Sequence, residues 1–107
     1  MGLEAEPAHV IAAAGRDGTL LRICGELDTA SRDVVEAEAM ATILAESSVI
    51  IDLAELTFCD SNGIAMFIVV DEKAKAEGTS LVVRGAAPQV RRVFEITGVD
   101  HIITAAD

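Results

Sequence analysis

Aromatic side chains are nearly absent from this sequence. Three Phe, no Tyr and no Trp occur among 107 residues, although 51% of the residues are hydrophobic. RNA-binding and single-strand-binding proteins stack bases on aromatic rings, so this composition argues against that function. The apolar residues are mainly Ala, Val, Ile and Leu, which is typical of a largely parallel β-sheet covered by helices.

Basic residues are also scarce. Eight Lys and Arg residues stand against 18 Asp and Glu residues, which gives a formal net charge of −10 at pH 7. A charge of this sign repels the phosphate backbone of nucleic acids and the anionic surface of membranes. We therefore expect neither nucleic acid nor a membrane as a direct partner.

Cysteine is limited to Cys24 and Cys59, which form no C-x-x-C pair. A chain of this length can fold around one hydrophobic core without disulfides, so we expect two free thiols and a reducing compartment. The sequence contains no apolar run long enough to cross a membrane and no N-terminal signal-peptide pattern. Together these features predict a cytoplasmic protein.

The residue combinations that catalysis or metal binding needs are missing. The only histidines are His9 and His101, and neither follows a motif typical of a Ser-His-Asp set. No group of His, Cys and carboxylate residues has metal-ligand spacing, and the glycines form no nucleotide-binding loop. We expect no metal, no cofactor bound by the domain itself and no enzymatic activity.

The order of the apolar segments predicts one α/β domain over residues 8–107, preceded by a flexible leader over residues 1–7. We expect a mixed sheet of about five strands covered by three to four helices, in the order β-β-α-β-α-β-α-β. The first two strands should pair antiparallel through the G-R-D-G turn at residues 15–18. The predicted strands cover residues 9–14, 19–25, 80–84 and 99–104, together with an apolar run that begins at residue 49.

The first predicted helix covers residues 30–45. Asp28 and Thr29 are expected to cap it, and Asp33 is a favourable acid in its first turn. Its core-facing stripe at helical spacing is predicted to consist of Val34, Ala37, Met40, Ala41 and Leu44.

Two further helices are predicted from their end signals. One follows Gly63, runs to about residue 76 and stops before Gly78. The other has Pro88 in its first turn and ends at Gly98.

The segment from residue 49 to residue 63 organises the rest of the sequence. An apolar, β-branched run predicts a buried strand, a short connector follows, and D-S-N-G at residues 60–63 stands where a second long apolar segment begins. Asp, Ser and Asn side chains accept hydrogen bonds from the free N–H groups of a helix start. From the spacing alone, Ser61 is explained as a helix cap. The same position also presents the Ser61 hydroxyl to a possible partner.

Three motifs, in this order, resemble the STAS domain family, the fold of bacterial anti-sigma factor antagonists. The phosphoserine motif L-x-F-x-D-S-x-G is matched by L-T-F-C-D-S-N-G at residues 56–63. The segments G-E-L-D at 25–28 and P-Q-V-R-R-V-F-E-I-T-G-V at 88–99 resemble two further family motifs. The resemblance covers about residues 8–104. Family members usually add a C-terminal helix, which we do not expect here.

The resemblance implies a binding switch. The unmodified form would bind an anti-sigma factor and so release a sigma factor. That anti-sigma factor is typically also a serine kinase that uses ATP, and its phosphorylation of Ser61 would end the complex until a serine phosphatase restores the hydroxyl. Asp60 would assist the transfer, Gly63 would let another backbone approach closely, and Asn62 replaces a second hydroxyl of many relatives.

Partner-binding candidates come from three segments. The helix after Gly63 is apolar around its first two turns, so either neighbouring helices or a partner must cover the apolar groups that a single core stripe does not use. The only basic pair in the sequence is either a solvated helix face or a contact for a partner's acidic groups or for the phosphate. The candidates are Asp28, Thr29, Ile64, Ala65, Met66, Arg91 and Arg92.

Two alternative functions remain open. The domain could be a STAS scaffold in a larger signalling assembly, without switching. It could also be a receiver-like domain phosphorylated on Asp60, but that chemistry needs Mg²⁺ and further acids after the first strand, which residues 9–14 do not provide.

Overall fold

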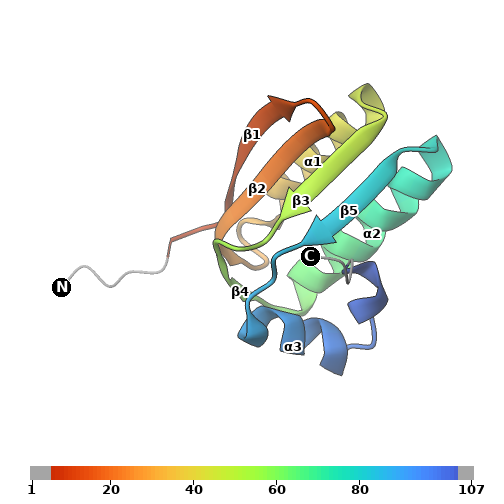
Figure 1. Ribbon diagram of the computed structural model, residues 1–107. Coiled ribbons are helices and arrows are strands. Elements are labelled where there is room, and N and C mark those ends of the chain that lie inside the picture. The colour runs from red at the N-terminus through yellow and green to blue at the C-terminus, as the bar shows by residue number, and fades with distance from the viewer. Residues whose placement is uncertain (1–5, 104–107) are drawn as a thin grey trace.

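Helices α1 and α2 pack on one face of a mixed β-sheet (Figure 1). The computed structural model describes residues 6–103. Its elements are β1 (His9–Gly15), β2 (Gly18–Leu27), α1 (Arg32–Ala45), β3 (Ser48–Asp52), β4 (Leu56–Cys59), α2 (Ser61–Glu77), β5 (Ser80–Arg84), α3 (Pro88–Ile96) and the 3₁₀ turn η1 (Asp100–Ile102). The prediction of a mixed sheet of about five strands with three to four helices is confirmed. The predicted order is wrong, because β4 precedes α2 and no strand follows α3 within residues 6–103.

Strand β2 is the centre of the sheet. Its first part pairs antiparallel with β1 and parallel with β3, and β3 pairs parallel with β5. Gly15 lies opposite Gly18, so the β1–β2 turn is tight, and the predicted hairpin is confirmed. The last residues of β2 instead pair with β4, after a shift of register between Gly25 and Glu26. One strand thus serves both the main sheet and the segment that carries the motif.

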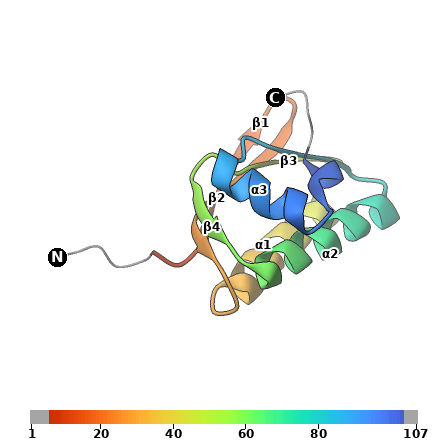
Figure 2. The ribbon, with the colours of Figure 1, turned by 90° about the horizontal axis from the view of Figure 1, so that it is seen from below.

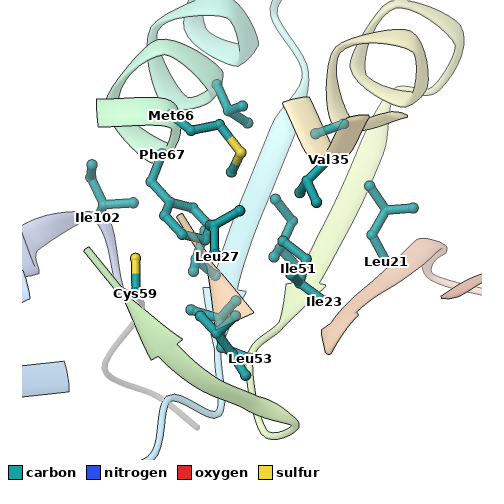
Figure 3. Packing of buried hydrophobic residues seen from close by; sticks show 14 of the residues in the cluster. Leu21, Ile23, Leu27, Val35, Ile51, Leu53, Cys59, Met66, Phe67 and Ile102 are labelled. Atoms are coloured by element: carbon teal, nitrogen blue, oxygen red, sulfur yellow. The ribbon is translucent and has the colours of Figure 1, made fainter. Parts of the chain in front are cut away.

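The core lies between the sheet and the helices α1 and α2. Alternate residues of β2 and β3, among them Leu21, Ile23 and Ile51, are almost completely buried. Figure 3 shows Phe67 of α2 pointing toward Leu27 at the end of β2. Burial of such side chains contributes roughly 1.5–3 kcal/mol each. The core therefore holds the end of β2, and with it the start of the motif region, in a fixed position.

The predicted core stripe of α1 is wrong. The side chains of Val34 and Leu44 are 66% and 60% exposed, whereas the buried residues of the helix are Val35, Ala39 and Ile43. Ala37 and Ala41 are exposed as well, and only Met40 of the predicted stripe packs partly against the core. Ala and Val occur on both sides of this helix, so the spacing is compatible with two different apolar stripes. Packing on the sheet buries the stripe that was not predicted.

The start of α1 also differs from the prediction. The helix begins at Arg32, and Ser31 stands at its N-cap without a capping side-chain bond. Asp28 accepts hydrogen bonds from the N–H groups of Ala30 and Ser31, so it closes a turn before the helix instead of capping it. Asp33 lies in the first turn as predicted.

Two strand predictions need correction. Residues 56–59, expected to be part of a connector, form β4, a strand of only four residues. Residues 100–102, expected in a last strand, form η1, and only Ile103 makes a single bridge to Val83. Residue 104 lies outside the described residues. Short pairings of this kind depend on distant neighbours, so the local pattern does not reveal them.

The N-terminal pairing begins earlier than predicted. Pro7 bridges Glu26, and the N–H of Glu26 donates to the carbonyl of Glu6 at 2.8 Å. Glu6 and Pro7 belong to the predicted leader, whose residues 1–5 lie outside the described part of the chain.

Candidate functional site

The site forms where two parallel strands end side by side. Leu27, the last residue of β2, pairs with Cys59, the last residue of β4. Each strand is followed directly by an aspartate, Asp28 or Asp60. The N–H of Asp60 donates to the carbonyl of Leu27 at 3.2 Å, which ties the two junctions together. Two of the sequence motifs therefore meet at one edge of the molecule.

Asp60, and not Ser61, caps helix α2. The Oδ1 atom of Asp60 accepts from the backbone N–H of Gly63 at 3.0 Å, and its backbone is extended as in other N-caps. Ser61 is the first helical residue and is exposed. The side-chain hydrogen bonds at this helix start are made by Asn62 and Asp60, and within residues 6–103 none involves the Ser61 hydroxyl. The capping explanation of Ser61 is thus wrong, and its hydroxyl is available to a partner.

Gly63 is required by close packing inside the chain. A Cβ atom at this position would lie 2.6 Å from Cys59 Sγ and 3.0 Å from the carbonyl oxygen of Leu27. Such distances are too short for any side chain. The expected close approach of another backbone is therefore real, but that backbone belongs to β2 of the same chain.

A direct contact joins the two loops beside Ser61. The Nδ2 atom of Asn62 donates to Oγ1 of Thr29 at 2.8 Å, and both residues are exposed. Both residues are among the predicted site residues, but the contact between them was not predicted. Thr29 lies one residue after Asp28 and Asn62 lies two residues after Asp60, and the parallel pairing of β2 with β4 brings these positions together.

The apolar partner candidates on α2 are buried. Ile64 is 3% exposed, Met66 is completely buried, and Ala65 is half-buried. Met66 points into the interior beside Phe67 (Figure 3). The core and the neighbouring helix α1 cover this part of α2. The proposal that Ile64 and Met66 form a surface for a partner is therefore wrong.

The basic pair lies on α3, which packs against β4 (Figure 2). Arg92 is exposed and makes an ion pair with Glu95 at 3.5 Å. Arg91 is half-buried and has no ion-pair partner in the described part of the chain. Neither arginine contacts Asp60 or Asp28 in an ion pair among residues 6–103, so their role toward a partner stays a prediction.

Both cysteines are free thiols, as predicted. Cys59 is buried, and burial, with the neighbouring Asp60 carboxylate as a smaller cause, raises its thiol pKa to about 12. Burial and the charge of Glu55 also raise the pKa of Cys24, which is half-buried. Neither thiol is a thiolate at neutral pH, so Cys59 is a packing residue under Gly63 and not a nucleophile.

Within residues 6–103, no cluster of three His, Cys, Asp or Glu side chains could hold a metal ion, and no pocket opens on the surface. No helix in this part of the chain is both long and apolar enough to span a bilayer.

These features define a small mixed-sheet α/β domain with an exposed serine at a helix start. A family model for "Mlab, STAS domain" matches residues 10–104, so the chain belongs to the STAS domain family. The anti-sigma-B factor antagonist of Listeria monocytogenes is 30% identical over 83 residues, which is 76% of this chain and 72% of the relative.

Solved structures support the fold. The anti-sigma factor antagonist SpoIIAA in its unphosphorylated form aligns with a TM-score of 0.74 at 22% identity, over 94% of this chain and 88% of that one. The phosphorylated form of the Bacillus cell fate determinant SpoIIAA aligns with a TM-score of 0.69 at 22% identity, over 94% and 91% of the two chains.

Proposed function

We propose that this chain is an anti-sigma factor antagonist switched by phosphorylation of Ser61. Its unmodified form binds an anti-sigma factor with serine kinase activity, which releases a sigma factor in the cytoplasm. The kinase uses ATP to modify Ser61, and a serine phosphatase reverses the modification. The observation that carries this proposal is the exposed Ser61 hydroxyl, which helix capping leaves unused because Asp60 is the cap.

The helix start suits the modified state. In the transfer, a bond forms between Ser61 Oγ and the γ-phosphorus of ATP, ADP leaves, and the hydroxyl proton passes to a base. Asp60 Oδ1 accepts from Gly63, and Oδ2 of the same carboxylate would take that proton. The phosphate then sits at the positive end of the α2 dipole.

The surface that a partner would contact is polar at its centre. It consists of exposed Thr29, Ser61 and Asn62, with half-buried Asp28 and Ala65 at its margin. A phosphate added there carries about −1.5 to −2 charges and must be desolvated when a partner covers it. This replaces an interface through Ile64 and Met66, which are buried.

The proposal is tested by mass spectrometry of the chain purified from its native cell, with and without phosphatase treatment. We expect one phosphate, on Ser61. In the same strain, Ser61→Ala should lose the phosphate and keep the anti-sigma factor bound. Thr57→Ala is the control and should keep the phosphate on Ser61, because the Thr57 hydroxyl already donates to the carbonyl of Gly25 at 3.1 Å and is not the expected acceptor. Phosphate on Thr29 or Thr57 instead of Ser61 would contradict the proposal.

The two alternatives make different predictions. A non-switching scaffold would bind its partner equally well with and without phosphate on Ser61. A receiver-like domain would carry an acyl phosphate on Asp60 and no phosphate on any serine. Oδ1 of Asp60 accepts from the N–H of Gly63, so the acyl phosphate would form on Oδ2.

A further inference from the structure

The outer edge of β1 is exposed and unpaired among residues 6–103. Figure 1 shows β1 at the margin of the sheet, with β2 as its only neighbour. Residues 11–15 are all exposed, and the Ile11 side chain is 52% exposed. Every second N–H and C=O group along an edge strand points away from its partner strand. The edge therefore offers backbone hydrogen bonds to another strand.

The other two sheet edges are protected against such pairing. β4 has four residues, and its ladder with β2 is interrupted by a register shift. β5 ends in Arg84 and is bridged from outside by Ile103. β1 has seven residues in unbroken register with β2, and it contains no Lys, Arg, Asp, Glu or Pro. Charged residues, proline and bulges are the features by which proteins normally block edge pairing.

The lack of charge points to a second copy of the same chain as the partner. A net charge of −10 repels two copies from one another over most of their surface. The one ionisable side chain of β1 is His9, and a contact between two β1 strands brings together no Asp, Glu, Lys or Arg side chains of the strands. It is therefore the sheet edge at which the association of two copies is least opposed by charge.

The size pattern of β1 is self-complementary in one orientation. The larger side chains of Val10 and Ile11 precede Ala12, and the small ones of Ala13 and Ala14 follow it. In an antiparallel pair centred on Ala12, Val10 faces Ala14 and Ile11 faces Ala13 of the other copy. A parallel pair in register would place Ile11 against Ile11. The antiparallel arrangement is also the one that a two-fold axis produces.

We propose that two copies of this chain pair through their β1 strands, antiparallel about a two-fold axis at Ala12, and so form one continuous sheet across a homodimer. The proposal does not depend on the function of Ser61, because β1 and the β2–β4 strand ends use different parts of β2.

The test is a charge exchange at the axis. Ala12 is exposed, so Ala12→Lys and Ala12→Glu should leave the monomer folded, but each places two like charges directly opposite one another in the dimer. In sedimentation equilibrium up to millimolar concentration, wild type should reach twice the 11.2 kDa of the chain. Each variant should dissociate about fivefold more readily or worse, and an equimolar mixture of the two should form a mixed dimer by native mass spectrometry.

The control is Ala76→Lys, which makes the same change at an exposed position of α2 and should dimerise like wild type. Hydrogen exchange adds a measurement without a variant: amides of residues 9–15 should exchange more slowly as wild-type concentration rises. A wild-type monomer throughout the range would overturn the proposal. So would a dimer that Ala12→Lys leaves unchanged, because its interface would lie elsewhere.

Discussion

Two serines stand at the starts of two neighbouring helices, and the structure treats them in opposite ways. Ser31, before α1, is 5% exposed; its hydroxyl donates to the carbonyl of Glu26 at 2.9 Å and accepts from the N–H of Asp28 at 3.2 Å. Ser61, at the start of α2, is exposed and makes no such bonds within residues 6–103. The residue type is the same, but Ser31 is the N-cap residue of α1 whereas Ser61 is the first helical residue of α2. Burial and hydrogen bonding decide which hydroxyl is structural and which is available.

The aspartates that precede the two helices explain this difference. Asp28 bonds to the N–H groups of Ala30 and Ser31 and holds the β2–α1 turn closed over Ser31. Asp60 reaches forward to Gly63 and caps α2 alone. At the first junction the serine hydroxyl is hydrogen-bonded within the turn, whereas at the second junction the serine hydroxyl makes no such bond within residues 6–103.

The largest expected effect is that of phosphate on Ser61. Covering a phosphate dianion without a matching cation costs several kcal/mol, so affinity for the anti-sigma partner should fall about a hundredfold or more. The melting temperature should hardly change, because the α2 N-terminus favours the charge by about 0.3–1 kcal/mol. Calorimetric titration and melting of both forms measure the two effects. Equal affinities would end the switch interpretation, and a large fall in melting temperature would make phosphate an unfolding signal.

Gly63→Ala should be the most damaging substitution at the second junction. The added methyl group would meet Cys59 Sγ at 2.6 Å and Leu27 backbone at 3.0 Å, and overpacking of this kind costs about 1–3 kcal/mol. Urea unfolding measures the loss. Gly78→Ala is unsuitable as a control because Gly78 has a positive φ of 71°; Ala65→Gly, also in the first turns of α2, tests helix propensity alone. A stable Gly63→Ala protein would show that β2 and β4 can move apart.

The comparison of the two serines is tested by Ser31→Ala against Ser61→Ala. Removing the buried Ser31 hydroxyl leaves the carbonyl of Glu26 and the N–H of Asp28 without this partner, which should lower the free energy of unfolding by about 1–3 kcal/mol. Ser61→Ala should change it by less than about 0.5 kcal/mol, because Asp60 supplies the cap. Chemical denaturation of both variants decides the point, and equal losses would show that Ser61 is structural too.

The cap itself is expected to contribute less than Gly63 or the Ser31 hydroxyl. Asp60→Ala should lower the free energy of unfolding by about 1 kcal/mol, since the N–H of Gly63 loses its acceptor. Asp60→Asn keeps a capping oxygen and should retain most of the stability. If Asp60 also receives the serine proton, Asp60→Asn should slow phosphorylation while the protein stays stable. A normal phosphorylation rate in Asp60→Asn would limit Asp60 to capping.

The sequence predicted those features that depend on local signals. The hairpin turn, the end of α2 at Gly78 and the position of the motif at a helix start all follow from Gly, Asp and Ser at fixed offsets, and the structure confirms them. The motif of the family resemblance lies in one continuous segment, and the structure places the end of that segment at the start of α2.

The failures have a common physical cause. The exposed stripe of α1 was predicted to be buried, and the buried Met66 was predicted to be a partner-binding residue. Both predictions failed because apolar residues surround both helices, and only tertiary packing decides which side meets the sheet. The short strand β4 exists because the end of β2 is available beside it. The contact between Asn62 and Thr29 joins residues 33 positions apart, and no local pattern reports such a distance.

The double pairing of β2 has a consequence for the order of folding. The β1–β2 hairpin is local and can close within microseconds, whereas the pairing of β2 with β4 joins residues such as Gly25 and Thr57, which are 32 positions apart. The neighbourhood of Ser61 is therefore assembled only when that late, long-range closure is complete. An enzyme that recognises this junction therefore binds and modifies only chains that have finished folding.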